Sequence, residues 1–115
     1  MGKTIFGINS PVSVFEGEGI FLGIMMNRIV QVGHPLGFHM RPKAAFAETA
    51  NRFQSDIQVI WEGKSINGKS MWDLMLVGAT QGAKMILEAA GPDAQEALDA
   101  LAVVIESPKL LDEID

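Results

Sequence analysis

The spacing of apolar residues from Asn27 onward predicts four strands and three helices. Strands are indicated by short runs rich in β-branched residues and by runs in which apolar and polar residues alternate. Such runs predict strands over residues 27–33, 56–62, 65–67 and 83–90. Helices are indicated where apolar residues recur every three or four positions. This spacing predicts helices over residues 40–53, from 71 to about 75–77, and from 94 to the Ser107-Pro108 pair.

The same spacing predicts which side chains form the core. Alternate strand residues point to one face, so the residues expected inside are Ile57, Val59, Trp61, Met85, Leu87 and Ala89. The inward faces of the long helices carry Phe46, Ala50, Phe53, Ala94, Ala97, Leu98, Leu101, Val104 and Ile105. The short helix cannot bury Met71, Trp72 and Met75 together, so we expect at least one exposed apolar side chain there.

Each predicted helix begins with residues suited to that position. His39 lies at or beside the start of the first helix, and Pro42 is tolerated there because the amide it lacks would have no partner within the helix. Ser70 and Asp73 have the spacing of a capping box, with Asp73 in place of the usual Glu or Gln. Asp93 precedes the last helix and is expected to cap it.

The order of the elements is strand, helix, strand, strand, helix, strand, helix. A chain of 115 residues with one tight hairpin is short for a doubly wound parallel sheet. An antiparallel four-stranded sheet with three helices on one face buries every apolar stripe. We therefore predict an α+β domain over residues 27–107, preceded by an N-terminal extension over 1–26 and followed by an acidic C-terminal tail over 108–115.

The extension over residues 1–26 combines glycines with scattered apolar residues. Glu16 and Glu18 interrupt its apolar pattern, which argues against a signal peptide, and the apolar run over 20–26 is too short to cross a bilayer. We expect a cytoplasmic protein without stable membrane insertion. The pattern leaves open whether the extension is flexible, an extra strand, a partner-binding arm or a non-native addition.

Composition argues against several classes of function. The net charge is −5, and the Lys and Arg residues are scattered, so we predict no nucleic-acid binding. The absence of cysteine excludes disulfides, thiol chemistry and Cys-type zinc sites. The chain has 2 histidines, His34 and His39, and further convergent ligands are lacking nearby, so no metal site is predicted.

The segment Gly37-Phe38-His39-Met40-Arg41-Pro42 carries the most distinctive chemistry of the chain. A phosphoryl group on the His39 ring would meet the backbone amides of Met40 and Arg41, the positive end of the helix dipole and the Arg41 guanidinium. The segment therefore favours a phosphohistidine carrier. A simpler interpretation also fits, in which His39 only caps the helix and Arg41 is a solvated charge.

Two further segments, over residues 63–75 and 91–98, accompany this one. In this order the three resemble the histidine-containing phosphocarrier (HPr) family of the bacterial phosphoenolpyruvate-dependent sugar phosphotransferase system. Residues 37–42 are similar to its signature Gly-Leu-His-Ala-Arg-Pro, residues 63–75 to its regulatory-serine signature, and residues 91–98 to the start of its last helix. The resemblance implies an open-faced sandwich of four antiparallel strands and three helices (βαββαβα).

The resemblance also implies roles for individual residues. His39 is the expected phosphoryl acceptor, through Nδ1, and Arg41 its phosphate partner. Ser70 matches a serine that a kinase/phosphorylase modifies in some lineages. The positions implied for docking of the donor, enzyme I, and of the acceptor enzyme IIA domains are Met71, Trp72 and Met75. The resemblance implies no cofactor and no free-standing catalytic activity.

Two residues depart from the family pattern. Met40 replaces an alanine beside the reacting ring, and His34 replaces a frequent asparagine, which bears on how the loop is held. These departures keep open an alternative, a regulatory protein-binding module that no longer relays to sugar permeases; a nitrogen-related phosphotransferase paralogue is equally open. A small enzyme with His39 as general base is disfavoured, because the signature contains no second group to orient the ring.

Overall fold

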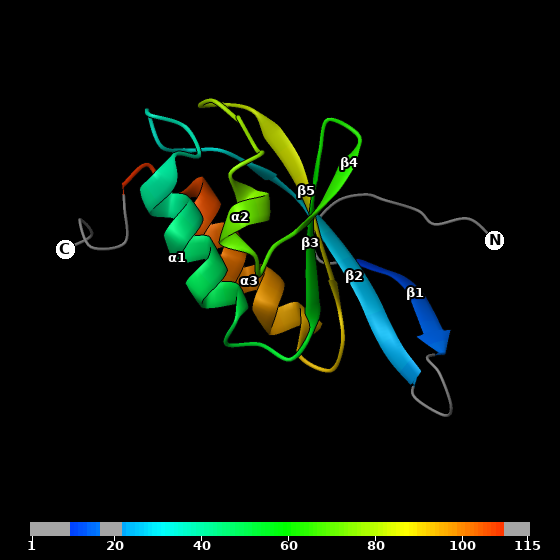
Figure 1. Ribbon diagram of the computed structural model, residues 1–115. Helices are drawn as coiled ribbons and strands as arrows, with labels where there is room; N and C mark the ends of the chain where they lie inside the picture. Colours follow the sequence, from blue (N-terminus) through cyan, green and yellow to red (C-terminus); the bar gives the residue numbers. More distant parts are fainter. Residues whose placement is uncertain (1–9, 17–21, 110–115) are drawn as a thin grey trace.

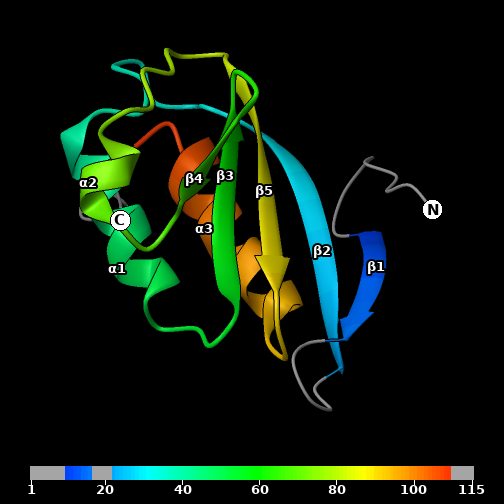
Figure 2. The ribbon, with the colours of Figure 1, turned by 45° about the vertical axis from the view of Figure 1, so that its right-hand side comes forward.

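The computed structural model describes residues 10–16 and 22–109, which form one sheet with helices on one of its faces (Figure 1). The strands are β1 (Ser10–Glu16), β2 (Leu22–Gln31), β3 (Asp56–Trp61), β4 (Lys64–Asn67) and β5 (Lys84–Ala90). The helices are α1 (Met40–Ala50), α2 (Met71–Leu74) and α3 (Ala94–Glu106). Figure 2 shows the helices together on one side of the sheet. The predicted α+β class and open-faced sandwich are confirmed.

Strand pairing in the sheet is antiparallel throughout the described residues. The strand order is β1-β2-β5-β3-β4, so the first and last strands of the predicted domain, β2 and β5, lie side by side. Their register runs from Met25 opposite Ala90 to Gln31 opposite Lys84. This pairing brings the end of β2 and the start of β5 to the same edge of the domain, where the loop that leads to α1 begins.

The N-terminal part of the sheet adds one strand to the four predicted, which is the extra-strand alternative that the sequence pattern left open. Residues 10–16, within the predicted extension, form the fifth strand, β1, which pairs with β2. β2 itself begins at Leu22 rather than at Asn27. Residues 22–26 are apolar apart from Gly23, so they lack the alternation that would have indicated a strand. Residues 1–9 and 17–21 of the extension, and 110–115 of the tail, lie outside the described residues.

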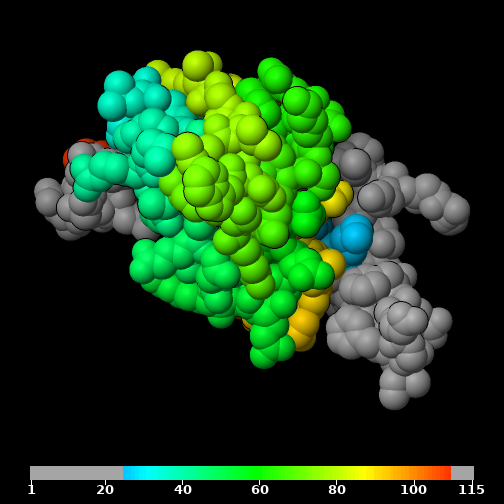
Figure 3. Space-filling model, viewed as in Figure 1, coloured from blue at the N-terminus to red at the C-terminus, as the bar shows by residue number. Residues whose placement is uncertain are grey.

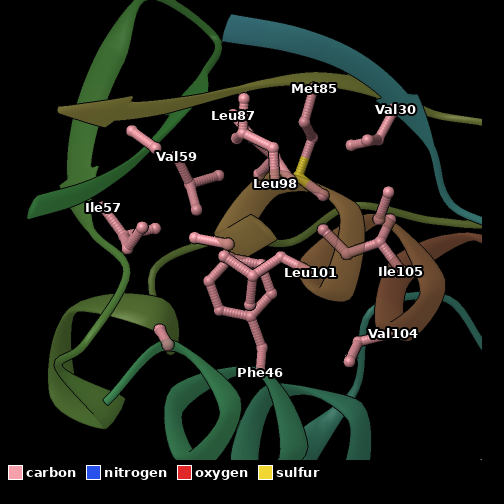
Figure 4. Packing of buried hydrophobic residues seen from close by; sticks show 14 of the residues in the cluster. Val30, Phe46, Ile57, Val59, Met85, Leu87, Leu98, Leu101, Val104 and Ile105 are labelled. Carbon is pink, nitrogen blue, oxygen red and sulfur yellow. The ribbon is translucent and has the colours of Figure 1, made fainter. Parts of the chain in front are cut away.

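The core fills the space between the sheet and the helices, with Phe46 of α1 between them (Figure 4). The sheet contributes Val30, Ile57, Val59, Met85 and Leu87, and α3 contributes Leu98, Leu101, Val104 and Ile105. The predicted inward faces of the strands and long helices are confirmed, although Trp61 and Phe53 are only half-buried. Phe53 lies beyond the first helix, because α1 ends at Ala50 and not at residue 53 as predicted. No helix in the described part of the chain is long and apolar enough to cross a membrane.

Two of the predicted helix starts need correction. Ser70 Oγ accepts the Asp73 amide at 3.2 Å, as in a capping box, but the Ser70 amide donates to the Asn67 carbonyl instead of to Asp73. Asp93 lies at the N-cap of α3 but makes no cap hydrogen bond with its side chain. Its carboxylate instead accepts from Ser55 and Gln54, which precede β3, and so joins two segments that are distant in sequence.

Candidate functional site

The loop between β2 and α1 is held by backbone hydrogen bonds to two other segments. Gly33 N–H donates to the Ile105 carbonyl at the end of α3, over 3.0 Å. Phe38 N–H donates to the Ala79 carbonyl, also over 3.0 Å, in the loop that follows α2. Gly37 has φ +78°, and a Cβ at this position would lie 2.7 Å from the Ala79 oxygen, so glycine is required there. The loop is therefore fixed before the helix begins.

His39 is the N-cap residue of α1, with extended backbone angles (φ −89°, ψ −168°), which confirms the predicted position of this helix start. The first intrahelical hydrogen bond runs from Lys43 N–H to the His39 carbonyl, at 3.0 Å. The amides of Met40 and Arg41 precede that bond, and Pro42 has no amide hydrogen. The amides of Met40 and Arg41 are therefore not used by the intrahelical hydrogen bonds, and the His39 side chain itself makes no cap hydrogen bond with them.

The side chain of His39 is half-buried, and its Nε2 atom is fully buried. The side chain of Arg41 is exposed, and that of Met40 is 52% exposed. Solvent access to the ring is thus confined to its other atoms, which include Nδ1.

Lys43 is a buried cation at this helix start that the sequence reasoning missed. Its side chain lies beside Phe38, with Nζ 5.9 Å from the centre of the Phe38 ring, which is itself buried edge-on against Phe46. Burial lowers the pKa of the Lys43 ammonium by removing water from the charged form. Lys43 precedes Phe46 and Ala50 by three and seven residues, so its place on the inward helical face is the signal that could have identified it.

His34 lies next to His39 in space. The two ring centres are 4.9 Å apart, and the ring planes are tilted by 53°. The Nδ1 atom of His34 accepts the backbone amide of Leu36 at 3.1 Å, and its carbonyl accepts the Gly37 amide at 2.8 Å. His34, which replaces the asparagine frequent in the family, therefore forms hydrogen bonds within its own loop. Its ring also contacts the ring of His39, the proposed acceptor.

The second helix places apolar side chains on the surface beside this loop. α2 packs against α1, and Figure 3 shows residues of the α1 start (cyan) and of α2 with its following loop (yellow-green) on one face. Trp72 is 82% exposed and Met75 48% exposed, which confirms the expected exposed apolar side chain, whereas Met71 is half-buried. We define the apolar patch as Leu36, Met40, Trp72, Met75 and Leu76, the exposed large apolar residues of these two segments.

The sequence reasoning overlooked two members of the apolar patch, Leu36 and Leu76, which are 73% and 71% exposed. Leu76 follows the end of α2, and Leu36 sits in the loop, so neither shows helical periodicity. Ser70 lies half-buried at the N-cap of α2, two residues before Trp72 of the patch. Among the described residues, no group of three or more His, Asp or Glu side chains is arranged to hold a metal ion.

The arrangement combines a nucleophilic ring, backbone donors and a cation at a helix start with an apolar surface nearby. Such a site can accept an anionic group on the ring and present it to a partner protein.

Comparisons with known proteins agree with this chemistry. The family model of the PTS HPr component phosphorylation site matches residues 26–107. The phosphocarrier protein HPr of Buchnera aphidicola subsp. Acyrthosiphon pisum is 36% identical over 81 residues, which cover 70% of this chain and 95% of that protein. The HPr-like protein Crh of Bacillus subtilis is 39% identical over 82 residues, 71% of this chain and 96% of Crh. The crystal structure of phosphocarrier protein HPr from Bacillus anthracis superposes with a TM-score of 0.68 at 38% identity, over 70% of this chain and 96% of that one. This chain belongs to the HPr family of phosphocarrier proteins of the phosphotransferase system.

Proposed function

We propose that this protein accepts a phosphoryl group on His39 from enzyme I and passes it, in the cytoplasm, to sugar-specific enzyme IIA domains. The observation that carries the proposal is the position of His39 at the N-cap of α1, half-buried and ahead of the first intrahelical hydrogen bond. A half-buried ring at this position remains partly open to solvent, so a partner can reach it.

We assign Nδ1 of His39 as the acceptor nitrogen. Nε2 is buried against the protein, so a phosphoryl group has no room at that atom. In the neutral ring, the Nδ1 lone pair attacks phosphorus, and the bond from phosphorus to the donor breaks with its electron pair leaving on the donor. In the onward step, a nucleophile of the acceptor attacks phosphorus, and the bond from phosphorus to Nδ1 breaks with its electron pair returning to Nδ1. The proton on Nε2 makes the ring a good leaving group, because the imidazole then departs neutral.

The helix start supplies the anion stabilisation that this cycle needs. The amides of Met40 and Arg41 and the helix dipole act on the phosphoryl oxygens, and the dipole contributes about 0.3–1 kcal/mol at an exposed site. The Arg41 guanidinium adds a charge-assisted donor from the same turn. These contributions hold the group without making its transfer prohibitively slow.

The test is incubation of the protein with phosphoenolpyruvate and enzyme I, followed by intact-mass measurement and acid treatment. We expect a gain of one phosphoryl group that is acid-labile and absent in His39→Ala. Arg41→Ala should slow phosphorylation about 10-fold, as expected for loss of one charge-assisted hydrogen bond. Arg52→Ala removes an exposed cation beyond the other end of α1 and serves as the matched control. A stable, folded wild-type protein that gains no phosphoryl group would refute the proposal.

We propose further that Ser70 is a site of regulatory phosphorylation by a serine kinase/phosphorylase. A phosphate there adds about −1.5 to −2 charges at pH 7 at the start of the helix that carries Trp72 of the apolar patch, which opposes docking of an apolar partner surface. With the cognate kinase and ATP, we expect an acid-stable phosphate that is absent in Ser70→Ala. Ser65→Ala, which changes an exposed serine on β4, is the control. No acid-stable phosphate with the kinase present would refute this role.

A regulatory protein-binding module is the second candidate function. Two observations favour it: Met40 puts an exposed apolar side chain directly after His39, and Crh, described as a catabolite repression HPr, is among the similar proteins. The distinguishing measurement is transfer from phosphorylated protein to IIA domains. Phosphorylation of His39 without onward transfer to any sugar-branch IIA domain would favour the regulatory module or the nitrogen-related branch over sugar transport.

A further inference from the structure

The ring of His34, in the loop before α1, contacts the ring of His39. The proposed role of His39 as phosphoryl acceptor does not by itself require this contact. His34 and His39 are five residues apart, and the intervening turn brings their ring centres to 4.9 Å. At this distance the rings are in contact. A group bonded to Nδ1 of His39 would therefore lie within reach of a neighbouring ring such as that of His34.

The hydrogen bonding of His34 determines which of its nitrogens carries the proton. Its Nδ1 accepts the Leu36 amide at 3.1 Å, so Nδ1 must present a lone pair. A neutral imidazole has one donor and one acceptor nitrogen, so the proton lies on Nε2. His34 is therefore a hydrogen-bond donor through Nε2, and its orientation is fixed by its own loop.

The loop that fixes His34 is itself rigidly placed. The His34 carbonyl accepts the Gly37 amide at 2.8 Å, and Gly37 adopts φ +78°. The residues on either side, Gly33 and Phe38, are tied to α3 and to the loop after α2. A donor on a loop held in this way loses little conformational freedom when it binds an anion, so its hydrogen bond is favourable.

We propose that His34 is a positioning residue of the phosphorylated state, in which its Nε2–H donates to a phosphoryl oxygen on His39. This inference rests on the proposed function of His39. The hydrogen bond adds a third kind of donor to the helix amides and the Arg41 guanidinium, from a side chain of the preceding loop whose ring already contacts His39. It slows hydrolysis of the phosphohistidine, because the phosphoryl oxygens are held in place.

The first test measures the lifetime of the phosphorylated full-length protein. The protein is phosphorylated with phosphoenolpyruvate and enzyme I, the donor is removed, and loss of the phosphoryl group is followed by intact mass. His34→Phe keeps a flat ring in contact with His39 but has no N–H donor, and we expect hydrolysis about 10-fold faster than in wild type. His34→Gln provides an amide oxygen for the Leu36 amide and an N–H donor, and should restore a lifetime within about 2-fold of wild type.

A second test uses the wild-type protein, so it does not depend on the folding of a variant. Long-range proton–nitrogen NMR correlations report the tautomer of His34, and we expect the proton on Nε2 before phosphorylation. After phosphorylation, that proton should move downfield and exchange more slowly with water. A proton on Nδ1, or an unchanged Nε2 proton after phosphorylation, would overturn the proposal.

The outcomes separate this inference from the proposed function. If wild type is phosphorylated on His39 and folded His34→Phe has an unchanged lifetime, the inference is wrong and the carrier function stands. If the phosphoryl group is found on His34 in His39→Ala, His34 is an acceptor and the positioning role is overturned. If wild type gains no phosphoryl group from a donor that phosphorylates other HPr proteins, both fail.

Discussion

Asn27 is a polar residue at a buried position of β2. Its side chain is fully buried in β2, and within the described part of the chain neither its amide oxygen nor its amide nitrogen has a hydrogen-bond partner. Leaving a buried amide unpaired costs about 1–3 kcal/mol. Residues of this kind weaken a fold, so Asn27 is a point at which the stability of this protein can be raised.

We predict that Asn27→Val raises the free energy of unfolding by about 1–2 kcal/mol, because it removes the unpaired amide and places a β-branched side chain in a strand. Urea denaturation followed by circular dichroism measures the change. The matched control is Asn67→Val on β4, since Asn67 is exposed and its Oδ1 accepts the Lys69 amide at 2.9 Å. That variant should be neutral or less stable. A less stable Asn27→Val protein would show that the amide is paired in solution.

At the scale of elements, Asp93 joins the start of α3 to the segment before β3. Its carboxylate accepts the Ser55 hydroxyl at 2.6 Å and the amides of Gln54 and Ser55, each at 2.9 Å. The Ser55 hydroxyl, followed by the two amides, lowers the pKa of the Asp93 carboxyl, whereas partial burial acts in the opposite direction. A lowered pKa in the folded state means that ionised Asp93 stabilises the fold.

Asp93→Asn should lower the free energy of unfolding at pH 7 by about 1–2 kcal/mol, because hydrogen bonds to an ionised acceptor are lost or weakened. The contribution is fully present above the unfolded-state pKa of about 4 and is lost as the pH falls through the lower, folded-state pKa. The gap between wild type and variant in urea denaturation should therefore shrink from pH 7 to pH 3. Asp99→Asn, which affects an exposed ion pair with Arg28, should cost less than about 1 kcal/mol. An equal gap at both pH values would contradict this role.

Sequence spacing predicted those elements whose two faces differ in polarity. The α3 stripe and the alternation of β5 are examples, since each places apolar residues on the buried face alone. The spacing of apolar residues did not predict the strand over residues 22–26, because these residues are apolar apart from Gly23 and show no alternation. The predicted cap at Asp93 was wrong because the carboxylate of Asp93 accepts a hydrogen bond from Ser55, which is distant in sequence. The helix start at His39 could be predicted because its signals lie in one contiguous segment, whereas the contact between His34 and His39 depends on the turn geometry.

At the scale of the whole molecule, β1 and the candidate site lie at opposite ends of β2. β1 pairs with the first half of that strand, from Leu22 to Asn27, whereas the loop that carries His34 and His39 begins after Gln31 (Figures 1 and 2). The family match begins at residue 26, so β1 lies outside it. The carrier chemistry should therefore be separable from the added strand.

Deletion of residues 1–21 should leave the rate of His39 phosphorylation by enzyme I within about 2-fold of the full chain, while lowering the melting temperature through loss of strand pairing. Thermal unfolding and timed intact-mass measurements on both proteins provide the comparison. Deletion of residues 110–115 is the control for shortening the chain at its other end. A deletion protein that is folded but is not phosphorylated would show that the added strand contributes to the site.

The exposure of Trp72 also gives the molecule a built-in optical signal. The chain has 2 tryptophans; Trp72 is 82% exposed on α2, whereas Trp61 is half-buried at the end of β3. Emission from an indole in water lies at longer wavelength than emission from an indole covered by protein. Coverage of α2 by another protein would shift the fluorescence of Trp72 towards the blue while Trp61 provides a constant background, so complex formation can be followed without a label.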